Sequence, residues 1–303
     1  MYNPFDNSRP AGTVRYRVYI PPHSLSTPTY RCLESHVHRR LQAQSVGVCR
    51  RNAYRRGLGC TGDGTIDSVG GSHIPQAFRS SLRETPSRSF GEGHWGAALA
   101  DKLQRKCDVL SRGFAGYNSS WCSHILPQII TKEMADNVAL VTLFFGTNDS
   151  VFEGFLQHVS LDKFKQNMKD MIHYLNSIGI GNEKIIIISP PMVNETAWDD
   201  ECKRSLGHPK NKTNELTVKY ADVCCSITKT TNIALIDLFH LMSSQQNWER
   251  FLLPDGIHLS VEGSKLLDQH LADVVSEKTG HLPMKFPLWR EVDGMNIEKS
   301  LVE

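Results

Sequence analysis

The sequence predicts an α/β sandwich built around a parallel sheet. Two runs, residues 138–145 and 184–189, are apolar on both faces, as strands in the middle of a parallel sheet are. From residue 89 onward, such runs alternate with segments whose apolar residues recur at helical spacing. This alternation is typical of parallel strands that are joined by right-handed helical crossovers.

The expected elements follow one another in order along the chain. The first helix places Leu99 and Leu103 on one side, and Gly113 ends the short strand after it. Ser160 is the expected N-cap of a later helix, and the last helix is expected to end near Gly280. Helices are expected at residues 95–106, 125–130, 161–178, 214–230 and 260–278, and strands at residues 108–110, 138–145, 184–189 and 233–238.

Residues 1–88 differ from the rest of the chain. They contain 13 Arg, no Lys and five acidic residues, whereas the remainder has 21 basic and 27 acidic residues. This segment is interpreted as an organelle transit segment, as a basic arm for anionic partners, or as a leader without a folded role. The lack of Lys favours the leader, because selection for positive charge would accept either base. We therefore expect a disordered or non-native segment at 1–88, a folded domain at 89–290 and a tail at 291–303.

Composition excludes several classes of protein. The longest apolar runs fall well short of the about 20 residues that a membrane-spanning helix needs, so no membrane span is expected. We find no fixed repeat, and the eight Cys residues show no C-x-x-C pair and no metal-ligand spacing. Since residues 1–10 are polar, no secretory leader is expected. The sequence predicts an intracellular, cytoplasmic protein with reduced thiols, and a mitochondrial location is the alternative.

Candidate catalytic residues stand at three points that a parallel sheet brings to one edge. Gly116 follows the short strand, whereas Asn148 and Asp149 follow the central strand. Asp255 and His258 precede the last helix. Each has a plain structural reading, as a turn glycine, a cap or a surface histidine. Together they suit acyl transfer, in which a carboxylate orients a histidine base while an amide and a glycine N–H stabilise an oxyanion.

Three blocks, GFAGYN at 113–118, FGTNDS at 145–150 and DGIHLS at 255–260, resemble the SGNH, or GDSL-type, hydrolases. Residues 95–121 and the closing PLWR are similar to the isoamyl acetate-hydrolysing esterase homologues of that family. The resemblance covers residues 89–290. It implies a flavodoxin-like three-layer α/β/α sandwich that hydrolyses small esters without a cofactor or a metal.

The resemblance also implies roles for single residues. Gly116 and Asn148 match the oxyanion-hole glycine and asparagine of the family. Asp255 and His258 match the acid and the base of its catalytic triad. Asp149 matches an aspartate beside the oxyanion asparagine, for which a structural role is expected.

The nucleophile block of the family is missing from this chain. Family members carry Gly-Asp-Ser after their first strand, about a dozen residues before the tryptophan matched by Trp95, and Glu84 stands at that position here. No apolar run precedes Glu84, so the first strand is expected to be absent or replaced. Residues 13–20 (TVRYRVYI) alternate like a strand and are one candidate for the gap, but we expect a compromised sheet with unpaired backbone groups. The nucleophile is therefore unknown, and the residues considered as substitutes are Ser68, Ser80, Ser81, Ser87 and Glu84 itself.

The sequence therefore predicts a hydrolase of small, acetate-type esters whose nucleophile is unknown and whose partner is the ester. One alternative is a catalytically inactive protein that keeps the pocket and binds esters. A second is a metal-dependent hydrolase that uses Asp149, Asp255 and His258, although the ligand spacing for a metal is missing. No nucleic-acid partner is expected, since such a role would rest on residues 1–88 alone.

Overall fold

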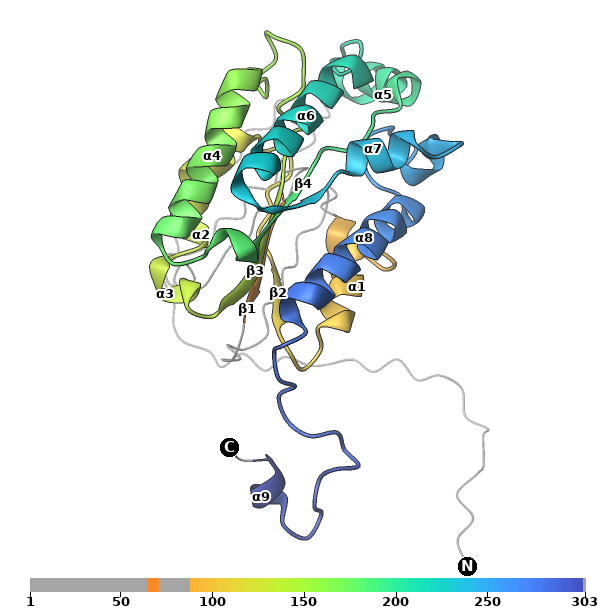
Figure 1. Cartoon of the computed structure of the whole chain (residues 1–303). Coiled ribbons are helices and arrows are strands. Elements are labelled where there is room, and N and C mark those ends of the chain that lie inside the picture. The colour runs from red at the N-terminus through yellow and green to blue at the C-terminus, as the bar shows by residue number, and fades with distance from the viewer. Residues whose placement is uncertain (1–64, 71–87, 302–303) are drawn as a thin grey trace, which may run out of the picture. The chain divides into compact units, whose positions relative to one another are not determined.

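The computed structural model describes residues 65–70 and 88–301 (Figure 1). In this part of the chain, five strands form one sheet in the order β2-β1-β3-β4-β5. The strands are β1 (Thr65–Gly70), β2 (Asp108–Ser111), β3 (Val138–Phe144), β4 (Ile185–Ile188) and β5 (Ala234–Ile236). Strands β3, β4 and β5 are parallel to one another.

Helices cover both faces of the sheet (Figure 1). One face carries α2 (Ser119–Ile129), α4 (Leu161–Ser177) and α6 (Asn214–Thr231). The other face carries α1 (Trp95–Lys102), α7 (Leu238–Ser243) and α8 (Val261–Thr279). The shorter helices are α3 (Lys132–Ala135), α5 (Glu195–Glu201) and α9 (Ile297–Leu301), with single turns at η1 (Arg88–Phe90), η2 (Asn182–Lys184), η3 (Cys202–Leu206) and η4 (Trp248–Phe251).

The burial of strand β4 explains why the sheet has a helical layer on each face, giving three layers in all. Its four isoleucines are all fully buried, and they alternate between two separate hydrophobic clusters. Ile185 and Ile187 pack with α2, α4 and α6, whereas Ile186 and Ile188 pack with α1, α7 and α8. A strand that is apolar on both faces needs a helical layer on each side. The predicted α/β sandwich with parallel central strands is therefore confirmed.

Strand β1 corrects the expectation of a gap in the sheet. It lies between β2 and β3 and runs antiparallel to both, so the sheet is mixed where a parallel one was predicted. Val69 is paired with Val109 on one side and Leu140 on the other. The backbone of β3 is thus paired on both sides, and the first strand of the sheet is replaced. Residues 13–20, the segment that the sequence offered for this place, lie outside the described residues.

Several boundaries differ from those predicted. Helix α2 begins six residues before the predicted residue 125, because Asn118 caps it by accepting a hydrogen bond from the Trp121 N–H at 2.9 Å. Helix α1 ends at Lys102, before Arg105 adopts a left-handed conformation with φ of 65°. Ser160 is the N-cap residue of α4, but its side chain makes no cap hydrogen bond. Helices α3, α5, α7 and α9 were not predicted. No helix in the described ranges has the length and apolar character that crossing a membrane requires.

Candidate active site

The predicted site residues lie on loops at one edge of the sheet. Strands β2, β3 and β4 run in the same direction, since β1 is antiparallel to β2 and to β3. The loops that follow them therefore leave from the same edge, where ligands of open α/β sheets bind. The loop of residues 255–258 joins this edge through a hydrogen bond that the Asn194 N–H, beyond β4, donates to the Gly256 carbonyl at 2.8 Å.

Asp255 and His258 form a hydrogen-bonded pair. The His258 Nδ1 lies 2.8 Å from Asp255 Oδ2, and about a quarter of each side chain is exposed. Asp255 Oδ1 accepts the backbone N–H groups of Ile257 and His258 at 3.0 and 3.1 Å. Burial alone would raise the pKa of Asp255, but the hydrogen bonds and charge of His258 outweigh it and hold this pKa below its usual value. An ionised carboxylate on Nδ1 keeps Nε2 as the proton acceptor.

Gly256 holds the loop of this pair against α5. Its φ is +82°, and an added Cβ would lie 2.7 Å from the Asn194 carbonyl oxygen and 2.8 Å from the Trp198 nitrogen. Both atoms belong to backbone, so neither is free to swing away. Only glycine fits this contact, and the acid–base pair is thereby fixed to the segment after β4.

Asn148 contacts the turn that contains Gly116. Its Nδ2 donates to the Tyr117 carbonyl at 2.9 Å. The Tyr117 N–H in turn donates to the Phe114 carbonyl at 3.1 Å, and Gly116 has φ of +78°. This is the arrangement of a type II turn, whose third position requires a left-handed residue. The structure thus brings the two predicted oxyanion residues to one connected pair of loops.

Asp149 lies behind Asn148 and is fully buried. Its Oδ1 accepts from the Ser119 N–H at 2.9 Å and from Ser119 Oγ at 2.5 Å. Ser119 Oγ also accepts from Asn167 Nδ2 on α4 at 2.9 Å. Desolvation raises the pKa of Asp149 to about 6 despite the hydrogen bonds from Ser119. These contacts join the end of β3 to the start of α2, which suits a structural role.

The candidate nucleophiles fare differently. Glu84, Ser80, Ser81 and Ser87 lie outside the described residues. Ser68 lies in β1 opposite Val141, three residues before the end of β3. At a rise of about 3.3 Å per residue, its backbone stands about 10 Å short of the loop edge. Strand β1 therefore does not bring Ser68 to the site.

Sequence reasoning missed three residues that shape this site. Ser119 binds Asp149, Gln157 Nε2 donates to the Gly116 carbonyl at 2.6 Å, and Asn194 binds Gly256. Asn194 gave one readable signal, since a polar residue after Pro190 and Pro191 suits a helix N-cap, and its side chain caps α5. Ser119 and Gln157 have no local pattern that would distinguish them. In the described ranges, no group of three or more His, Cys, Asp or Glu side chains is arranged to hold a metal ion.

Comparison with known proteins identifies relatives over most of the chain. The model of the GDSL-like Lipase/Acylhydrolase family matches residues 60–266, a range that includes β1. The human isoamyl acetate-hydrolyzing esterase 1 homolog is 40% identical over 217 residues, which is 71% of this chain and 87% of that protein. The GDSL esterase/lipase CPRD49 of Arabidopsis thaliana is 34% identical over 196 residues, 64% of this chain and 76% of that protein.

A solved structure supports the same fold. The lipase/acylhydrolase from Enterococcus faecalis superposes with a TM-score of 0.51 at 24% identity, over 68% of this chain and 92% of that one. At this identity, the likeness concerns the fold alone. The family match and the relatives, taken with the loops described above, show that the chain belongs to the GDSL-like lipase/acylhydrolase family.

Proposed function

We propose that the protein hydrolyses small carboxylic esters, with acetate esters as the substrate class. The observation that carries the proposal is the Asp255–His258 pair on the same edge as Asn148 and the Gly116 turn. In this proposal His258 is the general base and acid, Asp255 orients it, and the Asn148 amide and Gly116 N–H form the oxyanion hole. The choice of acetate esters is supported by the relatives that are named as isoamyl acetate-hydrolyzing esterase homologs and are 40% identical to this chain.

The chemistry balances as an acyl transfer. His258 Nε2 takes the proton of a hydroxyl, whose oxygen attacks the ester carbonyl carbon and places negative charge on the carbonyl oxygen. Each donor to that oxygen contributes about 3 kcal/mol to transition-state stabilisation. The tetrahedral intermediate then expels the alcohol oxygen, which receives the proton from the His258 imidazolium. If the hydroxyl is water, this step gives the acid directly; if it is a side chain, an acyl-enzyme forms and water releases it.

The nucleophile separates this proposal from its alternative. Counted without gaps from Trp95, Glu84 falls where the family has serine, and this substitution favours a protein that binds esters without turning them over. Loss of the nucleophile from a Ser-His-Asp set typically costs about 10⁶ in turnover. The two candidates share the pocket and differ in the presence of a reactive hydroxyl.

The test is hydrolysis of isoamyl acetate by the full chain. We expect His258→Ala to lower kcat by on the order of 10⁶, because the base and the leaving-group acid are lost together. A matched control is His240→Ala, since His240 Nδ1 lies 2.8 Å from Asp237 Oδ2 at the same i,i+3 spacing. That control should leave turnover unchanged, because His240 pairs with Asp237, the N-cap of α7, and within the described residues makes no contact with the loop of residues 255–258 among its hydrogen bonds. Equal loss in both variants would contradict the assignment of His258.

A fluorophosphonate probe identifies the nucleophile in the same preparation. A serine adduct, mapped by mass spectrometry and lost in His258→Ala, would support a side-chain nucleophile. No adduct and no turnover, together with calorimetric binding of isoamyl acetate, would support the binding protein instead.

We further propose an intracellular protein acting in lipid ester breakdown, in keeping with the free thiols of Cys107, Cys122, Cys202, Cys224 and Cys225.

A further inference from the structure

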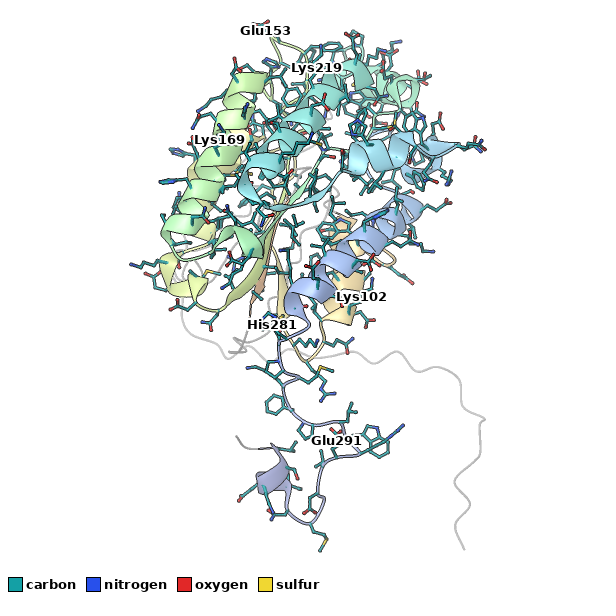
Figure 2. The ribbon with its side chains drawn as sticks, in the orientation of Figure 1. Lys102, Glu153, Lys169, Lys219, His281 and Glu291 are labelled. Atoms are coloured by element: carbon teal, nitrogen blue, oxygen red, sulfur yellow. The ribbon has the colours of Figure 1, made fainter. Side chains whose placement is uncertain are left out.

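The loop after β3, residues 151–158, contacts two segments that lie far apart in the sequence. On one side, the Phe152 N–H donates to the Asn211 carbonyl at 2.8 Å, and the Phe155 ring meets the His208 ring edge-on with centroids 4.9 Å apart. On the other side, Gln157 contacts the Gly116 turn. Figure 2 shows Glu153 of this loop at the opposite end of the sheet from His281, which follows α8. The loop therefore belongs to the edge that carries the site.

Gln157 clamps the Gly116 turn with both its side chain and its backbone. Its Nε2 donates to the Gly116 carbonyl at 2.6 Å. Its own backbone carbonyl accepts from Asn118 Nδ2 at 3.0 Å. The carbonyl between these two contacts, that of Tyr117, accepts from Asn148 Nδ2. Two successive carbonyls of the turn are thus held from two directions, and the peptide planes on either side of Tyr117 have little freedom to rotate.

The backbone of Gln157 is itself held in place. The loop closes where the Val159 N–H donates to the Asp149 carbonyl at 3.2 Å. The His158 N–H donates to the Phe155 carbonyl at 3.0 Å, and His158 Nδ1 lies 2.7 Å from the Val151 carbonyl oxygen. Tyr220 on α6 donates its hydroxyl to the Val159 carbonyl at 2.5 Å. Gln157 therefore reaches the turn from a fixed support.

From these contacts we propose that Gln157 is the positioning residue of the oxyanion hole. It fixes the peptide plane between Gly116 and Tyr117. This plane adjoins both the Gly116 N–H and the Tyr117 carbonyl that holds the Asn148 amide, so Gln157 limits the movement of both donors without touching the substrate. This inference rests on the proposed roles of Gly116 and Asn148. Preorganised donors are effective because they need no reorientation as charge develops, so loosening the turn should lower kcat more than it raises KM.

The first test needs no turnover. NMR of the nitrogen-labelled full chain follows the Asn148 side-chain amide and the Gly116 N–H in three variants. Gln157→Ala removes the donor, and we expect both signals to shift and the Asn148 amide protons to exchange faster. Gln166→Ala is the matched control, since Gln166 bonds Asp170 on the exposed face of α4 at 2.7 Å. It should leave both signals unchanged.

Gln157→Glu separates hydrogen bonding from packing. Glutamate has the shape of glutamine, but its carboxylate has no proton to donate. Below about pH 4 it is protonated and regains a donor. We expect the Asn148 signal of this variant to differ from wild type at pH 7 and to return toward the wild-type position as the pH falls. A role in packing alone would leave this variant wild-type at every pH.

The kinetic test distinguishes this inference from the proposed function. If the wild type hydrolyses isoamyl acetate, Gln157→Ala should lower kcat about tenfold with KM within about twofold. An unchanged kcat, or unchanged Asn148 and Gly116 signals in Gln157→Ala, would overturn the role of Gln157. If the wild type gives no turnover, the esterase proposal fails, while the NMR result still decides whether Gln157 positions the turn.

Discussion

At the scale of the single residue, Asp149 shows what burial does to a carboxylate beside the proposed site. Oδ1 accepts two hydrogen bonds from Ser119, whereas Oδ2 is buried and has no hydrogen-bond partner in the described part of the chain. Desolvation is the largest effect and raises its pKa to about 6. Between about pH 4 and pH 6, the folded protein therefore holds this proton more tightly than the unfolded chain does.

The pH dependence of stability tests this conclusion. Asp149 contributes stability when protonated, below the pKa of the unfolded chain, and this contribution is lost as the pH rises through about 6. Asp149→Asn removes the titrating group and with it this pH dependence. Between pH 4 and pH 7.5, the free energy of unfolding of the wild type should therefore fall, relative to that of the variant, by on the order of 3 kcal/mol. Urea unfolding of both proteins across this range measures it. Parallel pH profiles would show that Asp149 titrates normally.

At the scale of the element, α8 packs against η4 through a glycine. A Cβ added at Gly263 would overlap the carbonyl oxygen of Phe251. The same stretch is joined by the Ser260 N–H, which donates to the Phe251 carbonyl at 2.9 Å, and by Ser260 Oγ, which accepts from the Gly263 N–H at 3.1 Å. The loop of the acid–base pair leaves η4 and returns into α8, so this contact sets where the loop ends.

The sign of the stability change in Gly263→Ala tests whether this contact is as close as described. In an exposed helix, Gly→Ala stabilises by about 1 kcal/mol. We expect Gly263→Ala to destabilise by about 1–3 kcal/mol, because the helix must move away from backbone at η4. Lys265→Ala, on the exposed side of the same helix, should change stability by less than about 0.5 kcal/mol. Thermal unfolding compares the two, and a more stable Gly263→Ala would refute the close contact.

The elements that sequence reasoning predicted are those whose pattern is set by burial or capping. Strand β4 was readable because four consecutive isoleucines bury two faces, and α8 because Ser260 precedes a long amphipathic run. Helices α5 and α7 span two turns or fewer, which is too short for a period to show. The hydrogen-bonded pair at Asp255 was predictable from spacing, but Gln157 was not, since its partner Gly116 lies 41 residues away.

At the scale of the whole molecule, the two helical layers depend on one continuous sheet. Strand β1 was not predicted, because TIDSVG lacks an apolar pattern on both faces. Its place follows from pairing with β2 and β3, which are 27 residues apart in sequence. Pairing of distant segments leaves no local signal, and this is why the sequence alone indicated a gap.

Proline substitution identifies the strand that fills this place. Val69→Pro removes a donor from the middle of the sheet and should destabilise the protein by about 3 kcal/mol or more. Val18→Pro, in the competing segment 13–20, should leave the unfolding midpoint unchanged. Circular dichroism with urea compares the two variants. The reverse result would place residues 13–20, rather than β1, beside β3.

The close contact between Gly256 and the backbone at α5 has a consequence for engineering. The imidazole at 258 takes its position from a neighbouring stretch, residues 194–198, that supplies no reacting group. Replacing the segment between β4 and α6 to widen the substrate range would therefore move the imidazole of His258 as well as change the shape of the substrate site. Redesign of specificity should change other loops at this edge of the sheet and leave the contact between Gly256 and residues 194–198 unchanged.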